Sequence, residues 1–111
     1  MSYNIIAVPT FRKELKKLAK KYDSLKTDIS VLFESLEENP IQGTSLGRNC
    51  YKIRLAISSK GKGKSGGARV ITNVVITQET VYLLSIYDKS DKENLTDKEL
   101  DELLKYVPDD L

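Results

Sequence analysis

The residues best suited to chemistry lie in one glycine- and lysine-rich segment, residues 58–69, which reads Ser-Ser-Lys-Gly-Lys-Gly-Lys-Ser-Gly-Gly-Ala-Arg. Glycines let backbone amides approach phosphate oxygens closely, and lysines supply the counter-charge. The segment belongs to a wider block, residues 49–78, that contains no Asp or Glu and six basic residues: Lys52, Arg54, Lys60, Lys62, Lys64 and Arg69. A block of this kind predicts a surface that binds a polyanion.

The composition limits how such a surface could catalyse a reaction. The chain has no histidine, which excludes Ser-His-Asp and Cys-His arrangements and histidine acid–base relays. Because like charges repel, crowded cations favour the neutral amine of a central lysine, which can then act as a general base. The alternative is a basic hairpin loop without a catalytic role.

Two phosphate-binding motifs almost match this segment and both fail. Gly63-Lys64-Ser65 would close a P-loop only if residue 58 were glycine, and it is Ser58. Gly61, Gly63 and Gly66 fit the dinucleotide-binding pattern, which requires a following helix, whereas a β-branched strand follows here.

The length of 111 residues predicts one domain, residues 1–111. The single cysteine, Cys50, fits a reducing compartment. We find no targeting signal and no apolar run near the ~20 residues of a membrane span, so we expect a cytoplasmic protein without a membrane partner. The acidic residues of the C-terminal part form no metal-binding pattern, and we expect neither a metal nor a cofactor.

The N-terminal part of the chain predicts a strand and two helices. Residues 3–8 form an apolar run that ends at Pro9, and Thr10 is positioned to cap the helix that follows. Apolar residues then recur at helical spacing in two stretches that end before Asn39-Pro40: Phe11, Leu15, Leu18 and Tyr22, then Leu25, Ile29, Leu32 and Leu36. So short a link predicts an antiparallel helical hairpin.

The remainder predicts three strands and a last helix. Residues 40–49 are expected to form a loop, and residues 50–58, 69–77 and 81–87 to form strands. Thr96 and Glu99 have the spacing of a capping box that begins the last helix. The predicted fold is α+β, an antiparallel sheet packed against an N-terminal helical hairpin in the order β-α-α-β-β-β-α. If the first two of these strands pair, Arg54 and Arg69 lie near each other.

Tyr87 ends the last predicted strand, where side chains emerge at the rim of a sheet. It could stack on a base or donate a proton. The alternative is a tyrosine that covers the core.

The sequence resembles the RelE/HigB-type toxins of bacterial type II toxin–antitoxin modules over nearly the whole chain. The likeness is carried by Tyr51-Lys52-Ile53-Arg54-Leu55, the loop of residues 60–67, Ala68-Arg69-Val70-Ile71, Leu83-Leu84-Ser85-Ile86-Tyr87-Asp88-Lys89 and Asn94-Leu95-Thr96. The resemblance implies a RelE-like fold and a ribosome-dependent mRNA endonuclease. It also implies a metal-free reaction in which a ribose 2′-hydroxyl attacks the adjacent phosphate.

The resemblance also implies roles for particular residues and partners. The catalytic candidates are Lys62, Lys64, Arg69, Tyr87 and Lys89, with the choice of the lysine base left open. The candidates for RNA binding are Lys52, Arg54, Lys60, Lys16 and Lys20. Lys89 stands where a relative carries arginine and so lacks the bidentate fork. The expected partners are mRNA, the ribosomal A site and an antitoxin that is a small DNA-binding protein.

Two other functions fit the same resemblance. Toxins of the ParE type share the fold and inhibit DNA gyrase by binding it, although they usually lack the clustered basic residues. An RNA-binding module without catalysis is the third alternative.

Overall fold

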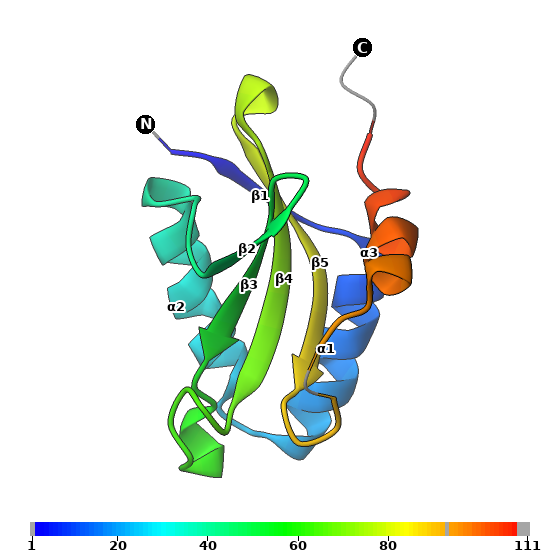
Figure 1. Ribbon diagram of the computed structural model, residues 1–111. Helices are drawn as coiled ribbons and strands as arrows, with labels where there is room; N and C mark the ends of the chain where they lie inside the picture. The colour runs from blue at the N-terminus through cyan, green and yellow to red at the C-terminus, as the bar shows by residue number, and fades with distance from the viewer. Residues whose placement is uncertain (1, 93, 109–111) are drawn as a thin grey trace.

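The computed structural model describes residues 2–92 and 94–108. Its centre is a five-stranded sheet with the strand order β1-β5-β4-β3-β2, and three helices cover it (Figure 1). The strands are β1 (Asn4–Ala7), β2 (Thr44–Gly47), β3 (Cys50–Leu55), β4 (Ala68–Val75) and β5 (Thr80–Asp88). A short 3-10 helix follows β3 at Ser58–Lys60, and another follows β4 at Ile76–Gln78.

Helices α1 (Pro9–Lys21) and α2 (Leu25–Glu38) run in opposite directions, as the predicted hairpin requires (Figure 1). α2 buries its whole apolar stripe, whereas α1 buries Phe11 fully and packs the rest of its stripe against the core half-buried. The ring centres of Phe11 and Phe33 lie 6.4 Å apart. The prediction that Thr10 caps α1 is wrong. The helix begins at Pro9, which already has the backbone angle of a first helical residue, so Val8 takes the capping position without a side-chain hydrogen bond.

The two longest strands, β4 and β5, form the centre of the sheet and are buried on both faces along almost their whole length. Their Val, Ile and Leu side chains suit such a doubly covered position. β3 is less buried: Cys50 and Ile53 are buried, Arg54 is exposed, and the other three residues are half-buried. The core therefore lies between β4, β5 and the two N-terminal helices.

The two outer strands differ in detail from the sequence expectation. β1 pairs with β5 in parallel, so the sheet is mixed. β2 lies within residues 40–49, which the sequence predicts as a loop. Its sequence, Thr-Ser-Leu-Gly, has no apolar alternation, and the strand forms by pairing with Tyr51 and Lys52 of β3.

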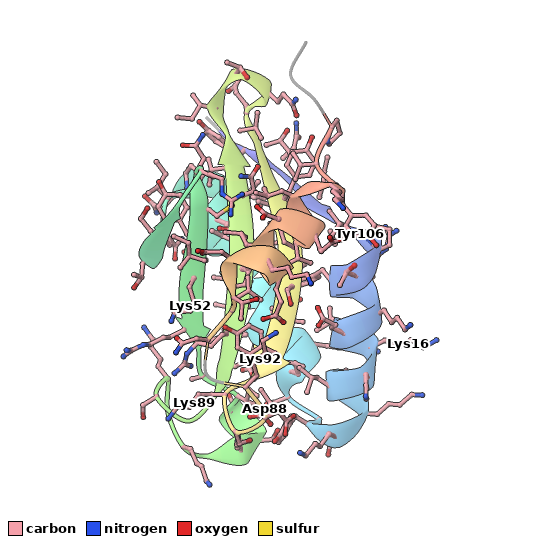
Figure 2. All side chains as sticks on the ribbon, turned by 45° about the vertical axis from the view of Figure 1, so that its right-hand side comes forward. Lys16, Lys52, Asp88, Lys89, Lys92 and Tyr106 are labelled. Carbon is pink, nitrogen blue, oxygen red and sulfur yellow. The ribbon has the colours of Figure 1, made fainter. Side chains whose placement is uncertain are left out.

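Helix α3 (Asp97–Leu104) lies on the opposite face from α2 and contacts β5 (Figure 2). The predicted capping box is present, because the Thr96 side chain accepts from the Glu99 backbone N–H and the Glu99 carboxylate accepts from the Thr96 N–H. Leu100 and Leu103 are buried against the sheet. The α+β architecture predicted from the sequence is confirmed. None of the helices in the described residues is long and apolar enough to span a membrane.

Candidate functional site

Three candidate residues form a row across the three neighbouring strands β3, β4 and β5. Arg54 pairs directly with Arg69, and Arg69 pairs directly with Tyr87. Residues directly opposite each other in an antiparallel sheet point to the same face. The expectation that Arg54 and Arg69 are neighbours is confirmed, and Tyr87 extends the row.

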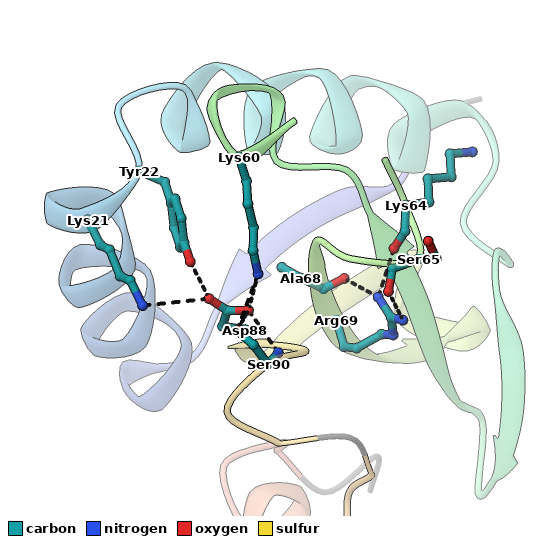
Figure 3. Close-up of polar contacts among 9 residues, drawn as sticks. All are labelled: Lys21, Tyr22, Lys60, Lys64, Ser65, Ala68, Arg69, Asp88 and Ser90. Atoms are coloured by element: carbon teal, nitrogen blue, oxygen red, sulfur yellow. Dashed lines mark hydrogen bonds and ion pairs between the residues drawn. The ribbon is translucent and has the colours of Figure 1, made fainter. Parts of the chain in front are cut away.

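The guanidinium of Arg69 holds the basic loop in place. Its Nη1 donates to the carbonyl oxygens of Lys64 and Ala68, both at 3.0 Å, and its Nη2 donates to the carbonyl oxygen of Ser65 at 3.2 Å (Figure 3). Only 5% of Arg69 is exposed. The planar guanidinium group can hold the loop in this way because its N–H donors have fixed directions and can bond several carbonyl oxygens at once.

The loop of residues 61–67 presents two lysine side chains to solvent. Lys62 and Lys64 are exposed, and the Lys64 side chain extends away from Arg69 while its carbonyl oxygen faces the guanidinium (Figure 3). The loop returns to the sheet at Gly67, where a β-carbon would lie 2.1 Å from the carbonyl oxygen of Leu55. Only glycine allows this close approach between the loop and β3.

Lys60 is bound to a buried carboxylate at the base of the loop. Its Nζ lies 2.7 Å from Oδ1 of Asp88. The side chain of Asp88 is 0% exposed, and that of Lys60 is 11% exposed. Asp88 also accepts hydrogen bonds from Tyr22 Oη at 2.5 Å and from Ser90 Oγ at 2.7 Å (Figure 3). The network joins α1, the 3-10 turn and the end of β5.

These contacts determine the charge states of the pair. Burial by itself would raise the pKa of Asp88, but the hydrogen bonds from Lys60, Ser90 and Tyr22 outweigh burial and hold that pKa well below its usual range. The hydrogen bond to Asp88 raises the pKa of Lys60 above its ordinary value. The expectation that the acid-free block of residues 49–78 leaves its cations without counter-charge is wrong for Lys60, because Asp88, which lies outside the block, pairs with it.

Tyr87 is 8% exposed, and its hydroxyl is buried without a hydrogen-bond partner in residues 2–92 and 94–108. Burial raises the pKa of Tyr87, and the nearby charge of Arg69 acts in the opposite direction. The Nζ of Lys92 lies 5.5 Å from the centre of the tyrosine ring. The phenol therefore keeps its proton beside two cations.

The remaining candidates divide between two surfaces. Lys52 and Lys89 are half-buried and lie on the same side of the molecule (Figure 2). The Nζ of Lys52 donates to Asn94 at 3.3 Å, and the backbone N–H of Lys89 donates to the carbonyl oxygen of Gly67 at 3.0 Å. Lys16 lies on the opposite side, on the outer surface of α1 (Figure 2). Lys16 and Lys20 line a separate cavity of about 390 Å³.

Two functional candidates could not be identified from the sequence: Asp88 and Glu14. Glu14 stands among the lysines of α1, yet its Oε1 accepts from Ser85 Oγ at 2.8 Å and from the Ile86 N–H at 3.4 Å. The only sequence signal was a single acid inside each basic or apolar run, which also describes many surface residues. In the described part of the chain, no group of three His, Cys, Asp or Glu side chains is placed to hold a metal ion.

Comparisons with known proteins agree with this architecture. A family model described as the RelE toxin of the RelE/RelB toxin–antitoxin system matches residues 10–109. Among solved structures, a mutant E. coli RelE toxin in the free state is 21% identical, with a TM-score of 0.65 over 97% of this chain and 100% of that chain. The intact E. coli RelBE toxin–antitoxin complex is 21% identical, with a TM-score of 0.62 over 78% of this chain and 96% of that chain.

A further match is the RelBE2 toxin–antitoxin complex of Mycobacterium tuberculosis. It is 21% identical, with a TM-score of 0.61 over 82% of this chain and 95% of that chain. At this identity the solved structures establish the fold, and the family model covers nearly the whole chain. The chain belongs to the RelE toxin family of type II toxin–antitoxin systems.

Proposed function

We propose that this toxin is an mRNA endonuclease that acts on the ribosome and is neutralised by an antitoxin. The observation that carries the proposal is the row of Arg54, Arg69 and Tyr87 across three neighbouring strands, beside a loop with two exposed lysines. Cations and a proton donor on one face match the requirements of phosphoryl chemistry without histidine.

In the proposed reaction, Lys62 or Lys64 in its neutral form accepts the proton of a ribose 2′-hydroxyl. The 2′-oxygen then forms a bond to the adjacent phosphorus, and the bond from phosphorus to the 5′ oxygen breaks. A 2′,3′-cyclic phosphate and a 5′-hydroxyl end result. Tyr87, or the ammonium of Lys89, donates the proton that the leaving 5′ oxygen takes up.

The arginines supply the positive charge for this step. Arg54 is exposed and able to contact a phosphate directly. Arg69 is nearly buried, so its charge is poorly screened by water and acts more strongly on the charge that develops at phosphorus. Arg69 also positions both lysine candidates, because it bonds the carbonyl oxygens of the loop that carries them. Lys52 extends the same basic face toward the RNA.

A second basic surface supports the ribosomal part of the proposal. Arg12, Lys16, Lys20 and Lys26 surround a cavity of about 390 Å³ on the outer side of the helices, and no acid lines it. Such a surface favours the phosphate backbone of a structured RNA, and binding there should weaken as salt increases. We propose that it docks the toxin on ribosomal RNA while the sheet face meets the message.

The antitoxin belongs to the proposal on two grounds. Two of the similar solved structures are toxin–antitoxin complexes. The exposed cations of the sheet face and loop also complement an acidic or groove-blocking segment.

The test is to incubate the purified toxin with translating ribosomes and map the RNA ends. We expect cuts within translated messages, with 5′-hydroxyl ends. Arg69→Ala should reduce cleavage by about 10²–10³-fold, the usual effect of removing one group that stabilises transition-state charge. Glu102→Gln, which removes an exposed charge from α3, is the control and should leave cleavage unchanged. Intact messages together with inhibition of DNA gyrase supercoiling would contradict the proposal and support a ParE-type function.

A further inference from the structure

The basic loop has a support on α2 that lies outside the candidate row. After β3 the chain turns back beside the start of α2, and the short 3-10 helix there begins at Ser58 (Figure 1). Asp28, in the first turn of α2, accepts two hydrogen bonds from Ser58. The Ser58 hydroxyl donates to Oδ1 at 2.6 Å, and the Ser58 backbone N–H donates to Oδ2 at 2.9 Å. The segment that leads into the loop is therefore fixed to a helix thirty positions earlier in the chain.

Ser24 reinforces this contact instead of capping its own helix. It occupies the N-cap position of α2, where a serine hydroxyl ordinarily accepts from a backbone N–H of the first turn. Ser24 makes no such bond. Its hydroxyl donates to Oδ2 of Asp28 at 2.8 Å and accepts from the Ser59 N–H at 2.8 Å. Natural proteins depart from local rules of this kind mainly at functional sites.

The hydrogen bonds keep the carboxyl group of Asp28 ionised at neutral pH. Burial by itself would raise the pKa of Asp28, but the hydrogen bonds from Ser58 and Ser24 outweigh burial and lower that pKa. An ionised carboxylate only accepts hydrogen bonds. Both polar groups of Ser58 therefore point to one partner, which fixes the orientation of the residue that begins the segment.

The support lies beside one of the two lysines proposed as the base. Lys64 and Arg54 line a cavity of about 690 Å³ between α2 and β3. Asp28 and Ser58 line the same cavity, and in the described part of the chain Asp28 is its only acidic residue. Arg69 holds the other end of the loop through the carbonyl oxygen of Lys64. The chain that carries Lys64 is thus held on both sides, by α2 before it and by β4 after it.

We propose that Asp28 is a positioning residue for RNA cleavage, which holds the basic loop through Ser58 so that Lys64 faces the phosphate bound at Arg54. The inference rests on the proposed function and adds a residue that contacts neither the message nor the reacting atoms. The hydrogen bonds of Asp28 are what matters for this role. Its negative charge opposes RNA binding, because a carboxylate in a cationic cavity repels phosphate.

The test is single-turnover cleavage of a message on translating ribosomes, with the toxin in excess. Asp28→Ala removes all three hydrogen bonds. It should lower the rate constant at saturating toxin about tenfold, because a misplacement of about 1 Å can cost up to about 10²-fold. The half-saturating toxin concentration should not rise, because the lost charge was negative. Glu34→Ala removes an exposed acid from the same helix and should leave the rate constant unchanged.

Asp28→Asn separates hydrogen bonding from charge. With its amide oxygen in the place of Oδ2, asparagine still accepts from the Ser58 N–H and the Ser24 hydroxyl. Its amide nitrogen donates to the Ser58 hydroxyl. We expect a rate constant within about twofold of wild type. The rate constant at saturation does not depend on the folded fraction of the toxin, so a loss of stability alone does not reproduce this pattern.

Limited digestion with trypsin, which cuts after lysine, measures the position of the loop separately. Lys62 and Lys64 are exposed, and a loop without its support on α2 should be cut faster. In Asp28→Ala we expect the rate to rise about fivefold, the change in an opening equilibrium that corresponds to the net loss of one hydrogen bond. Asp28→Asn and Glu34→Ala should be cut at the wild-type rate.

The inference is overturned if Asp28→Ala keeps the wild-type rate constant, or if Asp28→Asn loses as much as Asp28→Ala; the proposed cleavage stands in both cases. If wild type does not cleave, the proposed function fails. The trypsin digestion then decides whether Asp28 holds the loop, and equal rates in wild type and Asp28→Ala would reject that role.

Discussion

Asp88 offers the sharpest test of how the loop is supported. Its carboxylate is fully buried and accepts four hydrogen bonds: from Tyr22 Oη, Lys60 Nζ, Ser90 Oγ and the Ser90 N–H. Asp88→Asn preserves the volume but removes the charge and part of the acceptor capacity. The ammonium of Lys60, which is only 11% exposed, then loses its counter-ion.

The expected loss of stability follows from these contacts. Removing one partner of a buried ion pair costs about 3–5 kcal/mol. Lys60 keeps a hydrogen bond to Ser90 Oγ at 3.3 Å and lies 5.6 Å from the Tyr22 ring centre. We therefore expect Asp88→Asn to lower the free energy of unfolding by about 3 kcal/mol, the lower end of this range, as measured by urea denaturation.

A double-mutant cycle isolates the pair. Lys60→Met removes the cation, so Asp88→Asn combined with Lys60→Met should cost at least about 1 kcal/mol less than the sum of the single changes. Glu102→Gln breaks the exposed pair with Lys105 and should cost less than about 1 kcal/mol. Strict additivity, or a cost below about 1 kcal/mol for Asp88→Asn, would refute this reasoning.

The stability difference between wild type and Asp88→Asn should also depend on pH. The pKa of Asp88 in the folded state lies below its ordinary value of 3.8, so its contribution is complete above that pH and is lost as the pH falls toward the folded pKa. The difference in stability between wild type and Asp88→Asn should be constant above about pH 5 and should shrink below pH 3.8.

Three other substitutions test local geometry. Gly67→Ala places a β-carbon 2.1 Å from a strand carbonyl oxygen and should cost about 3 kcal/mol or more, whereas Gly61→Ala, at φ +71° in open space, should cost about 1–2 kcal/mol from backbone conformation alone. Thermal melting distinguishes them, and equal costs would show that the loop moves freely away from β3. Thr96→Ala removes the cap of α3 and should cost about 1 kcal/mol by urea denaturation, a value that an unchanged midpoint would contradict.

Periodicity in the sequence predicted most of the fold. The repeats beginning at Phe11 and Leu25 predicted two helices, and the strand expected over residues 50–58 corresponds to β3. The short strand β2 could not be predicted, because Thr-Ser-Leu-Gly carries no pattern and becomes a strand only through its pairing with β3. The parallel pairing of β1 depends on residues more than seventy positions later, which no local pattern encodes.

The candidate site was predicted less completely. The basic block and the neighbourhood of Arg54 and Arg69 followed from composition and strand pairing. The pairing of Asp88 with Lys60 could not be predicted from the charges along the chain, because the two residues lie twenty-eight positions apart. Glu14 could not be distinguished from the exposed residues of its helix either, because only its tertiary contact with Ser85 sets it apart.

The parallel pairing of β1 with β5 has a consequence for synthesis. Asn4–Ala7 has to wait for Thr80–Leu83 before this edge of the sheet can close. Arg69 and Tyr87 also enter one row only when β5 has joined β4. Pairings between distant residues slow folding. A nascent or prematurely terminated chain that ends before β5 therefore lacks the assembled row, and with it the activity proposed for that row.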